Sequence, residues 1–176
     1  DAIQYVADNV HDAFAVGDRI AVLQEGRVLQ QGPLDDVFQR PQSEQVAEIL
    51  GIRNLFRADI VGTNLDWLGL TLQAEVTVRD SGNVAVYIQP SEVKIIYPEA
   101  PVAEGLLGNL FDAEIITRQR HAAGWSVRVR LSNEQMIEIH HATTAYSELD
   151  LSTGTTIRVA LRREALQILR RGDPAS

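Results

Sequence analysis

An internal repeat constrains the fold of this chain more than any other feature. Residues 54–61 (NLFRADIV) return as residues 109–116 (NLFDAEII), identical at five positions. Further on, residues 84–96 (VAVYIQPSEVKII) correspond to residues 157–169 (IRVALRREALQIL), with the apolar residues in register. Alternating apolar and polar residues indicate strands that bury one face. The sequence therefore predicts two copies of one β unit, residues 54–98 and 109–171, the second enlarged by a longer hairpin.

Both copies consist of short alternating segments separated by turn residues. Examples are residues 56–61, 84–88, 110–117 and 125–131, and a single strand is predicted over residues 67–72. Short strands at close spacing with glycine-containing turns are typical of a small barrel or sandwich. We therefore expect a mainly β domain over residues 52–176.

The first fifty residues differ from the rest in charge and in periodicity. They contain nine Asp/Glu and three Arg, a net charge of −6, whereas residues 51–176 carry only −2. Residues 10–16 have helical spacing, residues 20–30 a hairpin pattern, and residues 34–38 and 43–50 the pattern of two short helices. The sequence therefore predicts a short α/β domain over residues 1–51, with a boundary next to Gly51.

Composition excludes several classes of protein. The chain has no cysteine, so it has neither disulfides nor thiolate metal sites. Its net charge is −8, and neither half has the basic balance expected of a protein that binds nucleic acid. No run of 18 apolar residues is present, so no bilayer span is predicted, and a cytoplasmic location is expected.

The segment 18–32, DRIAVLQEGRVLQQG, resembles the end of the nucleotide-binding domain in importer ATPases of the ATP-binding cassette (ABC) class. In that family an Asp-Arg pair opens such a hairpin, and a Pro-led helix follows. The segments 46–51 and 54–56 are similar to the helix and linker that lead into the regulatory domain. Residues 89–93 (QPSEV) resemble the family's R-P-E-[DE]-[IV] element, with Gln89 where Arg is usual.

The resemblance implies a regulatory domain with an OB-type barrel, called the TOBE domain, that pairs with a second copy of itself. It also implies transmembrane permease partners and a place at the inner face of the membrane. The linker and the tandem β unit look closest to importers of molybdate/tungstate, sulfate or ferric iron, so a transported oxyanion or metal is the expected ligand. Two alternatives stay open: a sugar or polyamine importer without ligand sensing, and a free-standing OB-type binding module.

The catalytic elements of the family are not recognisable in this sequence. A phosphate loop needs a Gly-Lys pair, and the only lysine is Lys94, which follows Val93. By the family register, the switch histidine that contacts the γ-phosphate is replaced by Asp8, whose carboxylate would repel phosphate; His11 lies three residues too late. We therefore expect no catalytic residue, cofactor or metal in this chain, and ATP with Mg²⁺ only in the full-length protein.

Candidate ligand-binding residues are few. Arg118, Arg120, Arg128 and Arg130 lie on two strands joined by a turn at residues 121–124, and alternation predicts a small cationic strip suited to an oxyanion or an acidic partner. Ser132 is a further candidate, because hydroxyl groups also bind oxyanions. A solvated sheet face is the alternative interpretation. His140 and His141 are adjacent in a strand, so they point to opposite faces and are not expected to share a metal.

Overall fold

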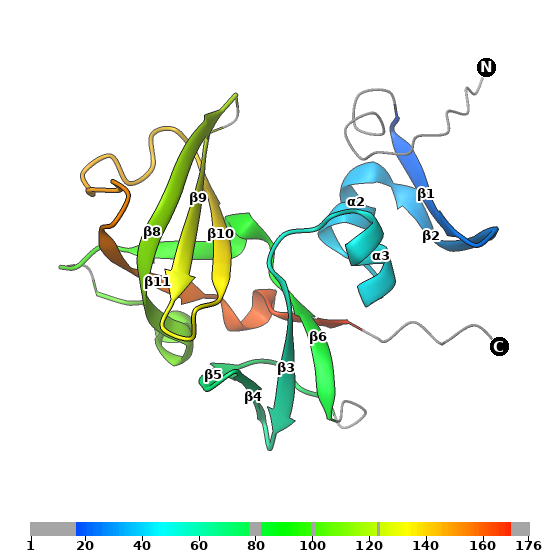
Figure 1. The fold of residues 1–176 in the computed structure, drawn as a ribbon, viewed down its shortest axis with the longest axis horizontal. Helices are drawn as coiled ribbons and strands as arrows, with labels where there is room; N and C mark the ends of the chain where they lie inside the picture. The colour runs from blue at the N-terminus through cyan, green and yellow to red at the C-terminus, as the bar shows by residue number, and fades with distance from the viewer. Residues whose placement is uncertain (1–16, 78–81, 100, 123, 170–176) are drawn as a thin grey trace. The chain divides into compact units, whose positions relative to one another are not determined.

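The computed structural model describes residues 17–77, 82–99, 101–122 and 124–169 (Figure 1). It divides into two compact units, residues 1–52 with 169–176, and residues 53–168. The helix predicted over residues 10–16 lies outside the described residues.

The first unit consists of a β-hairpin followed by two short helices. Its elements are β1 (Arg19–Gln24), β2 (Arg27–Pro33), α2 (Leu34–Gln39) and α3 (Glu44–Ile49). Ser43 caps α3, because its hydroxyl accepts a hydrogen bond from the backbone N–H of Val46 at 3.3 Å. The apolar residues of the hairpin and of both helices meet in a small core of Val22, Val37, Val46 and Leu50. The predicted hairpin and both predicted helices are confirmed.

The second unit contains two five-stranded antiparallel sheets. Their strands in chain order are β3 (Leu55–Val61), β4 (Asn64–Trp67), β5 (Leu70–Gln73), β6 (Asn83–Tyr87), β7 (Val93–Ile96), β8 (Leu110–His121), β9 (Gly124–Leu131), β10 (Met136–His141), β11 (Thr156–Leu161) and β12 (Gln167–Leu169). Short 3-10 turns lie at η1 (Pro90–Glu92), η2 (Glu104–Asn109) and η3 (Arg163–Ala165). The predicted mainly β fold is confirmed.

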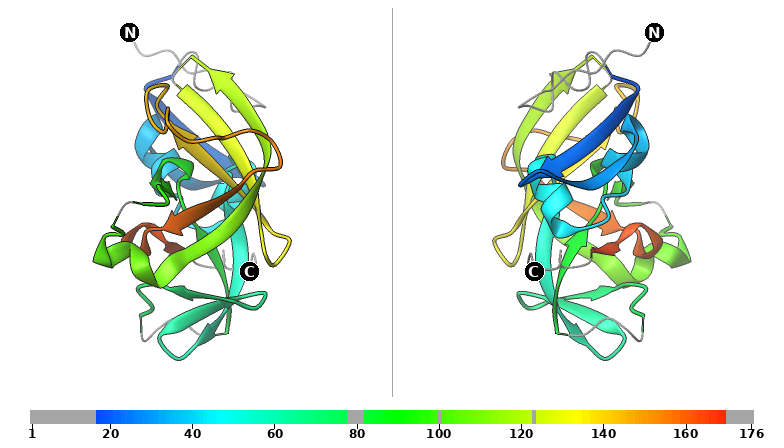
Figure 2. Two further views of the ribbon diagram at one scale, coloured as in Figure 1. Left: turned by 90° about the vertical axis from the view of Figure 1, so that its left-hand side faces the viewer. Right: turned by 90° about the vertical axis from the view of Figure 1, so that its right-hand side faces the viewer.

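The two sheets have the same order of equivalent strands. One sheet runs β10-β9-β8-β11-β7 and the other β5-β4-β3-β6-β12, so the last strand of each copy completes the sheet of the other. Figure 2 shows the hairpins β3–β4 and β8–β9 at opposite ends of this unit. Each five-stranded sheet therefore contains four strands from one copy and one strand from the other.

One predicted strand is wrong. Residues 67–72 do not form a single strand, because the chain reverses at Leu68 and Gly69 and separates β4 from β5. Both residues have left-handed backbones, with φ of 51° and 87°. A two-residue hairpin turn of this kind needs positive φ at both positions. The alternation of apolar residues continues through the turn, so the sequence pattern concealed it.

A single hydrophobic core joins the two sheets. The stacked rings of Phe56 and Trp67, with centroids 3.9 Å apart, lie in it on the side of the first copy. The second copy contributes alternate residues of its long strands, such as Val127, Val129 and Ile139, which are fully buried. Burying a Val or Ile side chain stabilises the fold by about 1.5–3 kcal/mol, so this shared core binds the copies to each other.

Two asparagines at equivalent repeat positions each bind the edge strand of the other copy. Asn54 bonds both the N–H and the C=O of Glu138 in β10, each at 2.7 Å. Asn109 bonds the N–H and C=O of Gln73 in β5 at 2.7 and 2.8 Å, and it also donates to the carbonyl of Leu161 at 3.0 Å. Each carboxamide thus occupies backbone groups that an edge strand would otherwise leave unpaired.

We predict that Asn109→Ala lowers the free energy of unfolding by about 2–4 kcal/mol, because it leaves the backbone groups of Gln73 and Leu161 unpaired. Urea denaturation followed by circular dichroism measures this loss. Asn83→Ala is the matched control, since Asn83 is exposed and bonds only exposed side chains. Equal losses in the two variants would contradict the structural role of Asn109.

Candidate functional site

A β-bulge in β8 decides where the four candidate arginines lie. Before the bulge Ile115 pairs with Val129, and after it Thr117 pairs with Arg128, so the extra residue reverses the alternation of β8. Directly opposed residues share a face of the sheet. Arg118 and Arg120, opposite Val127 and Trp125, therefore share one face, whereas Arg128 and Arg130 lie on the other. The single cationic strip predicted from alternation is wrong.

The face that carries Arg118 and Arg120 also carries the ring of Trp125. The guanidinium carbon of Arg118 lies 3.8 Å from the centroid of the Trp125 ring, a cation–π contact. Arg120 is the direct cross-strand partner of Trp125. Both arginines are exposed, and neither forms an ion pair with another described residue. Their guanidinium N–H groups are therefore free to bind an anion.

The remaining candidates lie in different surroundings. Arg130 donates to Glu114 at 2.6 Å and lies 3.6 Å from Glu134, so its charge is already balanced, and the hydrogen bond and charge of Glu114 raise its pKa. Ser132 is exposed in the β9–β10 turn, at the opposite end of β9 from the Arg118 side chain. Arg128 is exposed and forms no ion pair with a described residue. The structure therefore does not bring the five candidates into one site.

Asp8, the residue at the switch-histidine position, lies outside the described residues, as does His11. The Asp8 assignment therefore stays a prediction.

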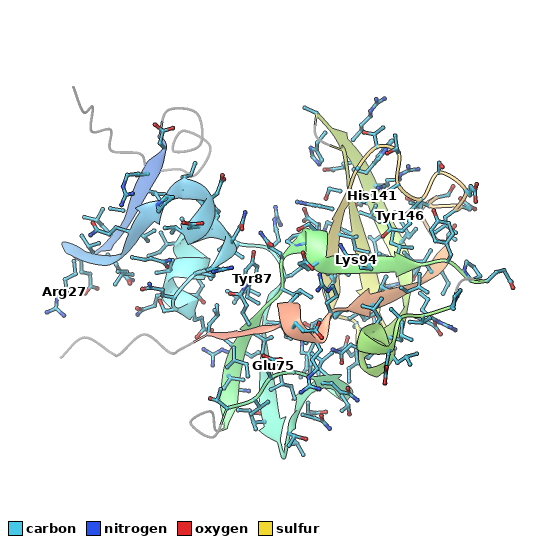
Figure 3. All side chains as sticks on the ribbon, turned by 180° about the vertical axis from the view of Figure 1, so that it is seen from behind. Arg27, Glu75, Tyr87, Lys94, His141 and Tyr146 are labelled. Atoms are coloured by element: carbon cyan, nitrogen blue, oxygen red, sulfur yellow. The ribbon has the colours of Figure 1, made fainter. Side chains whose placement is uncertain are left out.

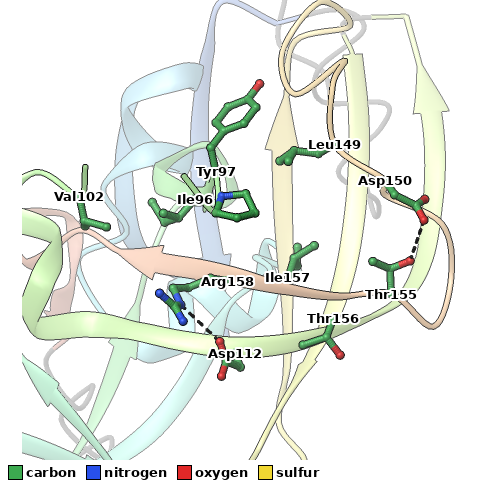
Figure 4. A pocket seen from close by; sticks show the side chains of 11 residues that line it. Ile96, Tyr97, Val102, Asp112, Leu149, Asp150, Thr155, Thr156, Ile157 and Arg158 are labelled. Atoms are coloured by element: carbon green, nitrogen blue, oxygen red, sulfur yellow. Dashed lines mark hydrogen bonds and ion pairs between the residues drawn. The ribbon is translucent and has the colours of Figure 1, made fainter. Parts of the chain in front are cut away.

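A pocket of about 430 Å³ lies on the second unit, away from the candidate arginines (Figure 4). Its floor is apolar, with Ile96, Leu149 and Ile157. At one end Arg158 meets Asp112 at 3.4 Å, and at the other Asp150 accepts hydrogen bonds. Hydrogen bonds from Ser152 hold the pKa of Asp150 below its usual value. With two carboxylates and one guanidinium, the lining is suited to a cationic or neutral molecule rather than to an oxyanion.

Glu138 is the centre of a polar cluster that sequence analysis did not single out. Its carboxylate accepts hydrogen bonds from His140 Nε2 at 2.7 Å and from the Ser126 hydroxyl at 2.9 Å, and it lies 3.7 Å from the Arg53 guanidinium. The hydrogen bond from His140 lowers the pKa of Glu138 to about 2, although burial opposes the shift. The hydrogen bond from Ser126 and the charge of Arg53 act in the same direction as His140. Arg53 lies far from the other members of this cluster in the sequence, so residue spacing could not indicate the cluster.

The two adjacent histidines point to different surroundings, as alternation predicts. His140 binds Glu138, whereas the ring of His141 lies edge-on against Tyr146, with centroids 5.1 Å apart (Figure 3). His141 Nδ1 donates to the carbonyl of Ala142 at 2.9 Å. Within the described ranges, no group of three or more His, Asp or Glu side chains is placed to hold a metal ion.

Comparisons with known proteins place these features in context. No protein-family model matches the chain. The molybdate/tungstate import ATP-binding protein of Thermococcus kodakarensis is 34% identical over 111 residues, which are 63% of this chain and 32% of that protein. The corresponding protein of Pyrococcus abyssi is 28% identical over 165 residues, which are 93% of this chain and 46% of that protein. Other relatives are sulfate/thiosulfate, spermidine/putrescine and Fe(3+) import ATP-binding proteins.

Its homologues are ATP-binding subunits of ABC importers. They match in their C-terminal region, and this chain spans less than half the length of the two relatives described above. The predicted resemblance to ATP-binding subunits of ABC importers is thus confirmed. None of the helices in the described ranges is long and apolar enough to cross a membrane.

A solved structure shares the fold of about two thirds of this chain. The cytoplasmic molybdate-binding protein ModG, crystallised with molybdate bound, superposes with a TM-score of 0.54 at 19% identity. The superposition covers 66% of this chain and 94% of ModG. At this level of identity the likeness concerns the fold alone, and it confirms the predicted OB-type architecture.

We predict that Glu138→Gln lowers the free energy of unfolding at neutral pH by about 1–3 kcal/mol, because an amide cannot replace a carboxylate that binds His140 and Arg53. The folded pKa lies below the usual value of 4.5, so this stabilisation is complete above pH 4.5 and is lost as the pH falls toward 2. Urea denaturation at a series of pH values should therefore show a steeper acid loss in the wild type than in the variant.

Glu134→Gln is the control for this experiment, because Glu134 is largely exposed and forms only a surface ion pair. Parallel pH profiles for the wild type and Glu138→Gln would contradict the role assigned to Glu138.

Proposed function

We propose that residues 53–168 form a regulatory and dimerising module of an ABC importer ATPase, and that this module senses the transported oxyanion or metal. The observation that carries the proposal is the fold shared with ModG, because 94% of a protein known to bind molybdate corresponds to part of this chain. The relatives named for molybdate/tungstate and sulfate/thiosulfate import support the same class of ligand.

In the full-length protein we expect ATP and Mg²⁺ to bind in the nucleotide-binding domain, and permease subunits to hold the ATPase at the cytoplasmic face of the membrane. The module itself contributes binding rather than hydrolysis. Relatives that are import ATP-binding proteins support this division of roles.

The exposed arginines indicate how an oxyanion would be held. Arg118 and Arg120 offer free N–H donors on one face and Arg128 on the other, and all three residues are exposed. A small anion on an open surface competes with bulk water and salt, so a single module would bind it weakly. A ligand bound between two modules would be enclosed, and it would hold the two ATPase domains apart.

A second candidate is a module that serves a polyamine importer. The pocket of Figure 4 favours it, because Asp112 and Asp150 stand at the two ends of an apolar floor. That arrangement suits a molecule with separated amino groups. The relatives named for spermidine/putrescine import are consistent with this alternative.

Thermal melting with millimolar molybdate, tungstate, sulfate, phosphate or spermidine tests both candidates. A ligand at about 100 times its Kd stabilises the folded state by about 2.7 kcal/mol, which raises Tm by several degrees. Selective stabilisation by molybdate, tungstate or sulfate, lost in Arg118→Gln/Arg120→Gln or in Arg128→Gln, is the expected result. Stabilisation by spermidine that Asp112→Asn removes would support the polyamine candidate instead. No shift with any ligand would contradict sensing.

A further inference from the structure

The pocket of Figure 4 is lined by a guanidinium group as well as by two carboxylates, and the polyamine candidate uses only the carboxylates. Asp112 and Arg158 lie together at one end, and Asp150 lies at the other. A polyamine would place an ammonium group beside the Arg158 guanidinium, where like charges repel each other. The lining therefore fits better a ligand that has an anionic group in addition to its cationic groups.

The ion pair between Arg158 and Asp112 leaves most of the guanidinium group available. It consists of one contact, from Nε of Arg158 to Oδ1 of Asp112 at 3.4 Å. Among the described residues, no other partner bonds the terminal nitrogens of Arg158 or Oδ2 of Asp112. A guanidinium binds a carboxylate through two parallel N–H bonds, and a carboxylate oxygen accepts from an ammonium group. This end of the pocket thus offers both contacts that the head group of an α-amino acid needs.

The first copy of the repeat shows that the sheet does not need this ion pair. When the copies are aligned, Asp112 corresponds to Arg57 and Arg158 to Ala85. Arg57 and Ala85 are direct cross-strand partners, as are Asp112 and Arg158. The ion pair is also exposed, with side-chain exposures of 56% for Arg158 and 72% for Asp112, so it contributes little to stability. Both side chains are therefore available to a ligand.

The other end of the pocket carries a carboxylate that local hydrogen bonds hold in place. Oδ1 of Asp150 accepts from the backbone N–H of Ser152 at 3.0 Å, and Oδ2 accepts from the Thr155 hydroxyl at 3.5 Å. Asp150 is exposed, so it can accept further hydrogen bonds from a ligand. Thr155 precedes Arg158 by three residues, so at the rise of an extended chain the two charged ends lie roughly 10 Å apart.

Apolar side chains separate the two charged ends. Ile157 lies between them in Figure 4, and Ile96 and Leu149 belong to the same floor. The aliphatic stem of a long basic side chain packs well on such a surface while its charged end stays in water. An extended arginine or lysine molecule, with a hydrogen bond of about 2.9 Å at each end, has the length required. The cavity volume of about 430 Å³ is in the usual range for small-molecule sites.

We propose that this pocket binds a basic α-amino acid, with its carboxylate on Arg158, its α-ammonium group on Asp112 and its side-chain cation on Asp150. The charges are complementary, because the ligand has two cations and one anion whereas the three residues supply two anions and one cation. This inference goes beyond the proposed function, since it gives the module a second kind of ligand. The pocket includes none of the candidate oxyanion-binding residues, so either proposal can fail alone.

Isothermal titration calorimetry of the whole chain with L-arginine tests the site. All three charged residues are exposed, so we expect a Kd on the order of 1 mM. L-Citrulline has the shape of arginine without the side-chain charge, and agmatine is arginine without the carboxylate. Each should bind about tenfold more weakly than L-arginine, because each leaves one charged group of the pocket without its partner.

Two variants test the two ends separately. Arg158→Gln should weaken L-arginine binding about tenfold but agmatine binding less than about twofold, since agmatine has no carboxylate. Asp150→Asn should weaken L-arginine binding about tenfold and leave L-citrulline binding unchanged, since citrulline has no side-chain charge. Arg163→Gln and Glu148→Gln are the matched controls, because both residues are exposed and lie outside the pocket lining, so every Kd should stay the same.

Three results would overturn the proposal: no binding of L-arginine at about 20 times the expected Kd, equal affinities for L-arginine and agmatine, or unchanged L-arginine binding in either pocket variant. If spermidine binds in the pocket and L-arginine does not, the polyamine candidate is supported and the proposal is wrong.

Discussion

The β module depends on a reciprocal contact in which each repeat binds the open edge of the other through one asparagine. A carboxamide has one donor and one acceptor side, so it can pair with the N–H and C=O of a single edge residue as a neighbouring strand would. Asn54 does this at Glu138 and Asn109 does it at Gln73. Together with the exchange of β7 and β12 between the sheets, this makes the two copies interdependent. The exchanged strands and the two asparagines thus both pair backbone groups that the edges of a small sheet would leave unpaired.

The same symmetry makes the differences between the copies informative. Gln73 and Glu138 occupy equivalent positions, opposite Asn64 and Arg128 respectively. The backbone of each is bound by an asparagine, but only Glu138 has a carboxylate, which gathers His140, Ser126 and Arg53. Arg53 and Asn54 begin the second unit, so the start of the module is tied to the edge of the second copy by both a side-chain and a backbone contact.

The two copies also differ in the length of equivalent strands and in the charged residues that these strands carry. The first copy is closed by a two-residue turn, and its surface arginine Arg57 bonds the side chain of Asn83. In the second copy the equivalent strands are longer, and the added residues carry cations and a tryptophan as well as the core residue Val127. Exposed connecting segments are where proteins often place their contacts with other molecules.

The sequence by itself determined the repeat, the mainly β class, both short helices and the resemblance to importer ATPases, because alternation, turn residues and local motifs act over a few positions. It did not determine which sheet each final strand joins, because exchange of β7 and β12 depends on contacts between copies more than fifty residues apart. The turn at Leu68-Gly69 was missed because the apolar pattern runs through it. The bulge at Ile115–Thr117 was missed because one extra residue leaves composition unchanged. That bulge alone separates Arg118 and Arg120 from Arg128 and Arg130, so only the tertiary structure decided which candidate residues can act together.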